Sequence, residues 1–194
     1  MNKTILNLAN AYVGECQARN RYTFYAKIAK KEGFEKITEV FEATATQETE
    51  HAKWLFRLLN SLLEKNNQKF EDLKLEVEVP TTLGNTKENL KSAIKGENFE
   101  NTTMYPDYSK IAREEGLDDI ADRLKSIAVA EKHHEDRFSK LLKEIENNTM
   151  FEKENKVYWI CRKCGYLEEG TKPPEKCPSC DHPYNYFEKQ CEDY

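Results

Sequence analysis

Two short stretches decide the fold: Glu48-Thr49-Glu50-His51 and Glu131-Lys132-His133-His134. Each places a glutamate three positions before a histidine, and the glutamates that open them, at positions 48 and 131, differ by 83 in the numbering. On a helix, residues i and i+3 share one face, so each stretch directs one carboxylate and one imidazole to a common point. This combination of oxygen and nitrogen ligands suits iron or manganese. The sequence therefore predicts two copies of a metal-binding helix.

The repeat extends on both sides of these stretches. Glu15 precedes Glu48 by an interval of 33 in the numbering, and Glu97 precedes Glu131 by an interval of 34. Lys27-Ile28-Ala29 returns at the same offset of 83 as Lys110-Ile111-Ala112, whereas Gly14-Glu15 returns at an offset of 82 as Gly96-Glu97. These matches predict two related helical hairpins, neither of which could bury its apolar face alone.

Composition limits the possible classes of protein. Charged residues make up 34% of the 194 residues and hydrophobic ones 38%, as expected of long helices with solvated outer faces. The net charge is −5 with no basic block, so nucleic acid is not expected as a partner. No apolar run approaches the roughly 18 residues that span a bilayer, and residues 1–5 lack a signal-peptide core. We expect a soluble, cytoplasmic protein without a membrane partner.

Apolar residues recur at helical spacing in four segments. The first two cover residues 4–31 and 35–64, the third begins near Thr86 and is interrupted or kinked at Pro106, and the fourth follows Gly116. Residues 65–85 lose this spacing and are long enough to cross from one end of a bundle to the other, with a short extended stretch expected at 73–79. The fold class predicted for residues 1–147 is an all-α four-helix bundle with a long crossover between helices two and three.

Each of the four helices carries a glutamate inside its apolar stripe: Glu15, Glu48, Glu97 and Glu131. Glu100 lies three positions after Glu97 and has no counterpart in the first half. Burying these carboxylates without a cation would cost many kcal/mol through desolvation and repulsion, a cost that two divalent metals remove. One glutamate on each of two helices plus Glu-x-x-His on the other two is the plan of di-iron carboxylate bundles. The alternative is a set of surface carboxylates with histidines satisfied in the core. His133, about 100° round the helix from His134, is expected to point outward or to lie behind the ligands without binding metal.

The composition changes after residue 147. Residues 148–156 are polar and predict a linker, and residues 157–194 contain two Cys-x-x-Cys pairs on either side of residues 165–176: Cys161, Cys164, Cys177 and Cys180. Four thiolates at this spacing predict a tetrahedral site for zinc or a single iron. A zinc ribbon is the simpler interpretation. Iron is favoured by the neighbouring redox-capable site, the many aromatic residues and a charge of −2 over residues 151–194. Cys16 and Cys191 receive no role.

Together these motifs resemble the rubrerythrin family along essentially the whole chain. The segments that carry the resemblance are residues 14–22, Gly96-Glu97-Asn98-Phe99-Glu100, residues 131–135 and the two cysteine pairs in this order. The resemblance implies a ferritin-like di-iron bundle followed by a small, β-rich, rubredoxin-like Fe(Cys)4 domain. It implies that Glu48 and Glu131 bridge the irons.

The resemblance also implies which residues hold each iron. By this resemblance, Glu15 and Glu100 would belong to one iron, and Glu97 with His134 to the other. In the family one iron moves between a glutamate and a histidine as its redox state changes, and Glu100 and His51 match that pair. Tyr22 and Tyr105 match tyrosines near the pocket. Cys16 departs from the family pattern, which has a small hydroxyl residue there.

The activity implied by the resemblance is a non-haem iron peroxidase. It would reduce hydrogen peroxide with electrons that pass from NAD(P)H through an external rubredoxin-type reductase and the Fe(Cys)4 centre. The resemblance also implies a head-to-tail homodimer. The main alternative is a ferritin-like ferroxidase or iron-handling protein, and a second is a non-enzymatic module with zinc in the four-cysteine site.

Overall fold

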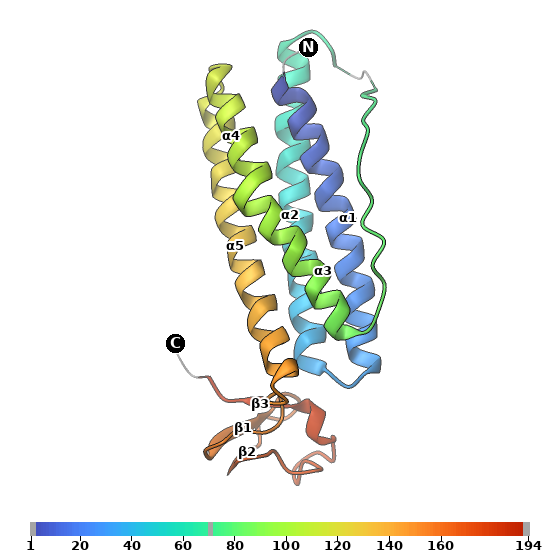
Figure 1. Cartoon of the computed structure of the whole chain (residues 1–194), viewed down its shortest axis with the longest axis vertical. Helices are drawn as coiled ribbons and strands as arrows, with labels where there is room; N and C mark the ends of the chain where they lie inside the picture. Colours follow the sequence, from blue (N-terminus) through green and yellow to red (C-terminus); the bar gives the residue numbers. More distant parts are fainter. Residues whose placement is uncertain (1–2, 70–71, 192–194) are drawn as a thin grey trace.

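The computed structural model describes residues 3–69 and 72–191 (Figure 1). The helical part contains α1 (Lys3–Lys31), α2 (Glu35–Lys65), α3 (Thr86–Phe99), the π-helix η1 (Glu100–Met104), α4 (Tyr105–Glu114) and α5 (Asp118–Glu146). The C-terminal part contains β1 (Val157–Cys161), β2 (Leu167–Gly170), the 3-10 helix η2 (Tyr184–Tyr186) and β3 (Phe187–Lys189). The predicted fold class, a four-helix bundle followed by a small β-rich unit, is confirmed.

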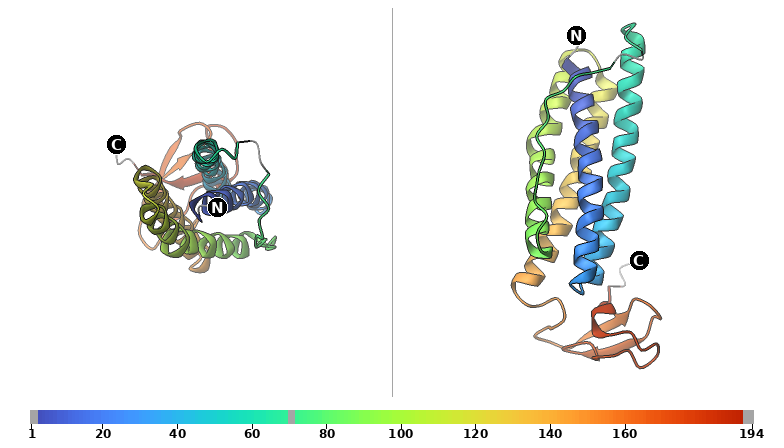
Figure 2. Two further views of the ribbon diagram at one scale, coloured as in Figure 1. Left: turned by 90° about the horizontal axis from the view of Figure 1, so that it is seen from above. Right: turned by 90° about the vertical axis from the view of Figure 1, so that its right-hand side faces the viewer.

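The chain passes along the bundle four times as helix and once as the irregular crossover between α2 and α3. α1 and α2 form an antiparallel hairpin, and the crossover then runs back along α1 to the start of α3 (Figures 1 and 2). α3, η1 and α4 together form the third long helix, and α5 forms the fourth. The stretch 73–79 joins no sheet, and the described residues 72–85 contain no regular secondary structure. The crossover is held instead by side chains, because the Tyr25 hydroxyl donates a hydrogen bond of 2.9 Å to the carbonyl of Thr82.

Local sequence explains where the helices begin and end. The α3 helix begins at a capping box, in which the Asn85 side chain accepts a bond of 3.0 Å from the Glu88 amide and Glu88 accepts one of 2.9 Å from the Asn85 amide. Gly33 and Gly116, which occupy matching positions in the two halves of the repeat, follow α1 and α4 with φ of 84° and 75°. Glycine adopts this left-handed conformation without steric cost, so the two hairpins end their first helix in the same way.

The π-helix η1 holds one residue that the first hairpin lacks. The interval between matching residues is 82 for Glu15 and Glu97, but 83 for Tyr22 and Tyr105. One residue has therefore been added between positions 97 and 105, where η1 lies. A π-turn accommodates one extra residue without breaking the helix. The third helix was expected to be kinked or interrupted at Pro106, but Pro106 lies in the first turn of α4. The helical hydrogen-bond pattern changes earlier, at Glu100–Met104, and the helix continues through it.

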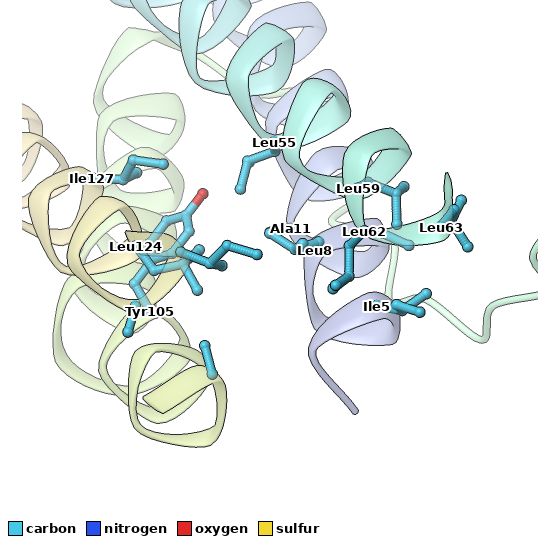
Figure 3. Close-up of a cluster of buried hydrophobic side chains, with 14 residues drawn as sticks. Ile5, Leu8, Ala11, Leu55, Leu59, Leu62, Leu63, Tyr105, Leu124 and Ile127 are labelled. Carbon is cyan, nitrogen blue, oxygen red and sulfur yellow. The ribbon is translucent and has the colours of Figure 1, made fainter. Parts of the chain in front are cut away.

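Two apolar clusters fill the bundle. One lies toward the N-terminal end of α1, where Leu55, Leu59 and Leu62 of α2 face Leu8 and Ala11 of α1 (Figure 3). The other lies toward the C-terminal end of α1 and is dominated by aromatic rings: Tyr22, Tyr25, Phe41 and Phe138. The glutamates of the apolar stripes lie between these two clusters along each helix. The metal-type residues therefore form a layer between two hydrophobic layers.

The C-terminal unit is a three-stranded antiparallel sheet in the order β2-β1-β3. It lies at the end of the bundle where α5 finishes and α1 turns into α2 (Figures 1 and 2). Lys36 of α2 pairs with Glu188 at 2.8 Å, and Glu39 of α2 pairs with Arg162. Among the described residues, no helix is both long and apolar enough to cross a bilayer.

Candidate metal centres

The middle layer of the bundle consists of carboxylates and imidazoles. Glu15, Glu48, Glu97 and Glu131 are at most 1% exposed, and His134 is 2% exposed. The helices α1, α2, α3 and α5 each supply one of these glutamates, so the carboxylates enter the interior from four sides. His133 lies on the outer face of α5 and is exposed, in line with the expectation from its position in the helical turn.

Ligand atoms in this layer form two groups of four, each within 4.8 Å. The first group is Glu15, Glu48, His51 and Glu131, and the second is Glu48, Glu97, Glu131 and His134. The two groups share Glu48 and Glu131, and the histidine rings of the two groups lie 5.9 Å apart. The layer therefore offers two adjacent metal positions with two carboxylates in common.

The shared carboxylates have the orientation that a bridge requires. The Oε2 of Glu48 lies 3.0 Å from Nδ1 of His51, and its Oε1 lies 3.1 Å from Nδ1 of His134. Glu131 repeats this arrangement, with Oε1 and Oε2 each 2.8 Å from one of the two histidines. Each of these carboxylates thus presents one oxygen to each metal position.

Glu15 and Glu97 each belong to one group only. Nδ1 of His51 lies 3.9 Å from Glu15, and Nδ1 of His134 lies 3.4 Å from Glu97. Tyr105 donates a hydrogen bond to Glu15, and Tyr22 donates one to Glu97. Both tyrosines are fully buried, and each holds a carboxylate from the opposite half of the repeat.

Glu100 lies beside the two groups and belongs to neither. It is 9% exposed at the start of η1, and its pKa is raised by burial and by the charges of Glu97, Glu131 and Glu48. His51 occupies the metal position next to Glu15 in this arrangement. Glu100 is therefore a spare carboxylate at the edge of the centre.

The electrostatics of the layer call for cations. Buried oxygens of Glu15, Glu48, Glu97 and Glu131 lack a hydrogen bond of acceptable geometry. Burial raises the pKa of Glu97 to about 8, and burial with the charges of Glu131, Glu48 and Glu100 raises the pKa of Glu15 well above its usual range. Carboxylates in this situation take up protons unless a positive charge replaces them. The donor set and its unpaired oxygens fit two divalent metal ions.

Protonation of His51 and His134 offsets part of the negative charge of the buried carboxylates. Burial opposes protonation of His134, but the close carboxylates of Glu131, Glu48 and Glu97 raise its pKa to about 12. Burial likewise opposes protonation of His51, and Glu131 and Glu48 raise its pKa to about 9. Metal binding would release these protons, because a histidine ligand must be neutral.

Sequence reasoning missed residues that support the layer from outside. The Glu135 carboxylate accepts hydrogen bonds of 3.1 Å from Asn98 and 2.8 Å from Asn101, which ties α5 to α3 and η1. Burial raises the pKa of Glu100, and the charge of Arg21 opposes that rise. No local motif predicts either role. The one available clue is that each residue is next to a site residue in the sequence, since Glu135 follows His134 and Arg21 precedes Tyr22.

The second candidate centre is the four-cysteine cluster at the tip of the sheet. The Sγ atoms of Cys161 and Cys180 lie 3.7 Å apart, and those of Cys164 and Cys177 lie 3.6 Å apart. These separations exceed the roughly 2 Å of a disulfide and fit thiolates around one ion. Cys164 is exposed, whereas Cys161 and Cys177 are buried.

The two cysteine pairs have the same backbone geometry. The amide of Gly165 donates to the carbonyl of Cys161 at 2.8 Å, and the amide of Asp181 donates to the carbonyl of Cys177 at 3.0 Å. Gly165 and Asp181 both have positive φ, at 75° and 62°. The backbone amide of Tyr166 lowers the pKa of Cys164 to about 6. This geometry favours a thiolate at Cys164 before any metal is bound, whereas at Cys180 a backbone amide lowers the pKa but burial and the neighbouring thiols raise it to about 12.

Comparisons with known proteins agree with both centres. The family model described as rubrerythrin matches residues 7–142, and the model of the rubrerythrin rubredoxin-like domain matches residues 159–188. The chain is 58% identical to a rubrerythrin-type protein of Methanocaldococcus jannaschii, over 100% of this chain and 96% of that protein. It is 47% identical to rubrerythrin-1 of Clostridium acetobutylicum, over 99% and 96% of the two chains.

A solved structure shows the same arrangement. Nigerythrin in a mixed-valence state superposes with a TM-score of 0.63 at 29% identity, covering 96% of this chain and 86% of that one. Both the bundle and the four-cysteine unit therefore have counterparts of known structure.

Proposed function

Because this chain belongs to the rubrerythrin family, we propose that it reduces hydrogen peroxide to water. The observation that supports this proposal is the pair of four-residue groups sharing Glu48 and Glu131, in one chain with a four-thiolate site. Two irons held by these groups would supply the two electrons that cleave the O–O bond, and the four thiolates would hold an iron suited to one-electron transfer.

The residues of the chain prepare the site for that chemistry. Tyr22 and Tyr105 fix the outer carboxylates Glu97 and Glu15 by hydrogen bonds. Burial and the neighbouring carboxylate charges raise the pKa of both tyrosines well above the usual value, so they remain protonated donors. The hydrophobic layers on both sides shield Glu15, Glu48, Glu97 and Glu131, which are at most 1% exposed. We propose that Tyr22 and Tyr105 position these ligands.

The proposed electron route begins outside the chain. An NAD(P)H-dependent rubredoxin-type reductase would deliver electrons to the four-cysteine site, where Cys164 is exposed to a partner. Within one chain the two centres are well separated, because the cysteine unit lies beyond the end of the bundle (Figure 1). Glu39, which contacts Arg162, lies nine positions before Glu48, or ~14 Å along α2 before the arginine side chain is added. A head-to-tail homodimer would shorten this route, and we propose that assembly.

A stopped-flow experiment tests the reaction. Iron-loaded protein is fully reduced without air and mixed with one equivalent of hydrogen peroxide or of dioxygen, while the visible band of the four-thiolate iron is followed. We expect fast return of the red colour with peroxide and much slower return with dioxygen. If peroxide leaves that iron reduced and dioxygen instead mineralises added Fe(II), the ferroxidase alternative replaces the proposal.

A pair of variants tests the electron route. Cys161→Ser removes a buried ligand of the four-cysteine site, and Cys191→Ser changes an exposed cysteine outside it. We expect the first variant to lose NADH-driven peroxide turnover while reduced bundle iron still reacts once, and the second to behave as the native protein. Undiminished steady-state turnover in Cys161→Ser would contradict the route. Sedimentation over a range of concentrations tests the dimer, which a clean monomer with full turnover would exclude.

A further inference from the structure

The buried layer approaches solvent at His51. Its side chain is 16% exposed, whereas those of its three partners, Glu15, Glu48 and Glu131, are at most 1% exposed. A cavity of about 160 Å³ lies against it between α2 and α5, lined by His51, Trp54, Arg123, Ser126 and Ile127. This volume admits several molecules of the size of water. The cavity is thus a short passage from the surface to the first metal position.

The outer side of this passage is an aromatic ring that two arginines contact. The Trp54 side chain lies one helical turn after His51 and is 38% exposed. The guanidinium of Arg123 lies 4.5 Å from the centre of its ring, and that of Arg57 lies 5.2 Å from it. Cation–π contacts of this kind contribute modestly at exposed sites, so the ring is held in place without being locked. Arg123 comes from α5, so this contact spans the gap between the two helices.

A second cavity reaches the layer from the other side. It has a volume of about 430 Å³, lies between α1, η1 and the crossover, and touches Glu100. Phe99, which is 54% exposed, forms part of its wall. Glu100 belongs to neither four-residue group, so this second cavity ends at the spare carboxylate. The two cavities are alternative routes to the centre, and they can be tested separately.

We propose that Trp54, held by Arg123 and Arg57, is a lid over the entrance at His51, which admits hydrogen peroxide and excludes larger organic hydroperoxides. The identity of the substrate rests on the proposed function, but the entrance and its lid do not. Removal of the indole opens the outer wall of the cavity at His51, whereas removal of Phe99 enlarges only the cavity at Glu100. Access to the first metal position therefore depends on Trp54 and Arg123.

Fluorescence provides the first test, because the chain has two tryptophans and the other, Trp159, is fully buried. In the full-length protein without metal in the bundle, acrylamide should quench the emission of Trp54. Binding of Fe(II) or Co(II) to the bundle should quench this emission further. If both tryptophans are protected from acrylamide in solution, a second copy of the chain covers this surface and the lid is overturned.

Access of small molecules to the loaded centre provides the second test. Removal of Fe(II) by bipyridine and binding of azide to the diferric protein are timed in Trp54→Ala, Trp54→Phe, Arg123→Gln and Phe99→Ala. We expect both rates to rise several-fold in Trp54→Ala and Arg123→Gln, and to stay near the native values in Trp54→Phe, which keeps a ring. If the two rates rise in Phe99→Ala and stay at the native values in the other variants, small molecules enter through the cavity at Glu100 and the lid at His51 is overturned.

Substrate size provides the third test. The turnover ratio of tert-butyl hydroperoxide to hydrogen peroxide should rise in Trp54→Ala and remain native in Phe99→Ala. If the native protein has no peroxidase activity but Trp54→Ala still speeds iron removal by bipyridine and azide binding, the lid is supported and the proposed function is wrong. If peroxide turnover is present and neither access rate responds to Trp54 or Arg123, the proposed function stands and the lid fails.

Discussion

Removal of metal from the bundle should make stability strongly dependent on pH. Burial raises the pKa of Glu97 from 4.5 to about 8, so between these pH values the folded protein holds a proton that the unfolded chain has lost. Stability therefore falls as pH rises through this window. His51 acts in the same direction: burial opposes its protonation, but Glu131 and Glu48 raise its pKa from 6.5 to about 9.

The loss of stability can be calculated for the protonation of Glu97 alone. Between pH 5 and pH 8 the linkage relation gives a loss of ~3 kcal/mol for a carboxyl group with these two pKa values. For a chain of this length that loss corresponds to a fall in melting temperature of roughly 6–12 °C. Two divalent ions in the same layer keep the carboxylates ionised, so the loaded protein should lack the fall.

The assay compares two preparations that both carry zinc in the four-cysteine site and differ only in bundle metal. Helix unfolding is followed by circular dichroism at several pH values from 5 to 8. Glu97→Gln without bundle metal is the control, and it should show a shallower decline than the native chain. A melting temperature that is constant or rises with pH in the native metal-free protein would refute the assignment of protonated buried carboxylates.

Four further substitutions have definite expected outcomes. Glu48→Ala removes a carboxylate that faces both metal positions, so metal analysis should show loss of both bundle ions, whereas Glu100→Ala should retain them in the reduced protein. Phe138→Ala leaves a cavity beneath Tyr22, whose ring centroid lies 5.3 Å from that of Phe138, and should cost ~3–5 kcal/mol in urea unfolding. Asn85→Ala breaks the capping box of α3 and should cost ~1 kcal/mol in the same assay, while a loss below a few tenths would mean that the cap is dispensable.

Helical periodicity was sufficient to locate the main elements. α2 was expected over residues 35–64 and runs from Glu35 to Lys65, and the third helix begins at Thr86 as expected. These positions follow from local signals: an apolar stripe, a glycine after the last turn and a capping box before the first. The start of η1 could not be located in this way, because the chain remains helical through residues 100–104 and no local motif marks a π-turn there. Only the change of the repeat interval from 82 to 83 marks the added residue.

In the metal layer, too, some features could be predicted from the sequence and others could not. The i, i+3 spacing predicted that Glu48 and His51 share a face, and the structure brings them together with Glu15 and Glu131. The position of Glu100 outside both groups could not be read from sequence, because Glu97 and Glu100 have the same spacing as a ligand pair. Contacts between helices were equally inaccessible. The meeting of Arg123 with Trp54 depends on the register of α5 against α2, which no local pattern encodes.

The hydrogen bonds from Tyr22 to Glu97 and from Tyr105 to Glu15 bear on the origin of the chain. Each tyrosine secures a carboxylate of the other half, and each four-residue group draws on both halves. The described part of the crossover, residues 72–85, contributes no residue to either group. A single hairpin of this kind would have needed an identical hairpin beside it to retain metal. The internal repeat has the form that duplication and fusion of a gene for one such hairpin would produce.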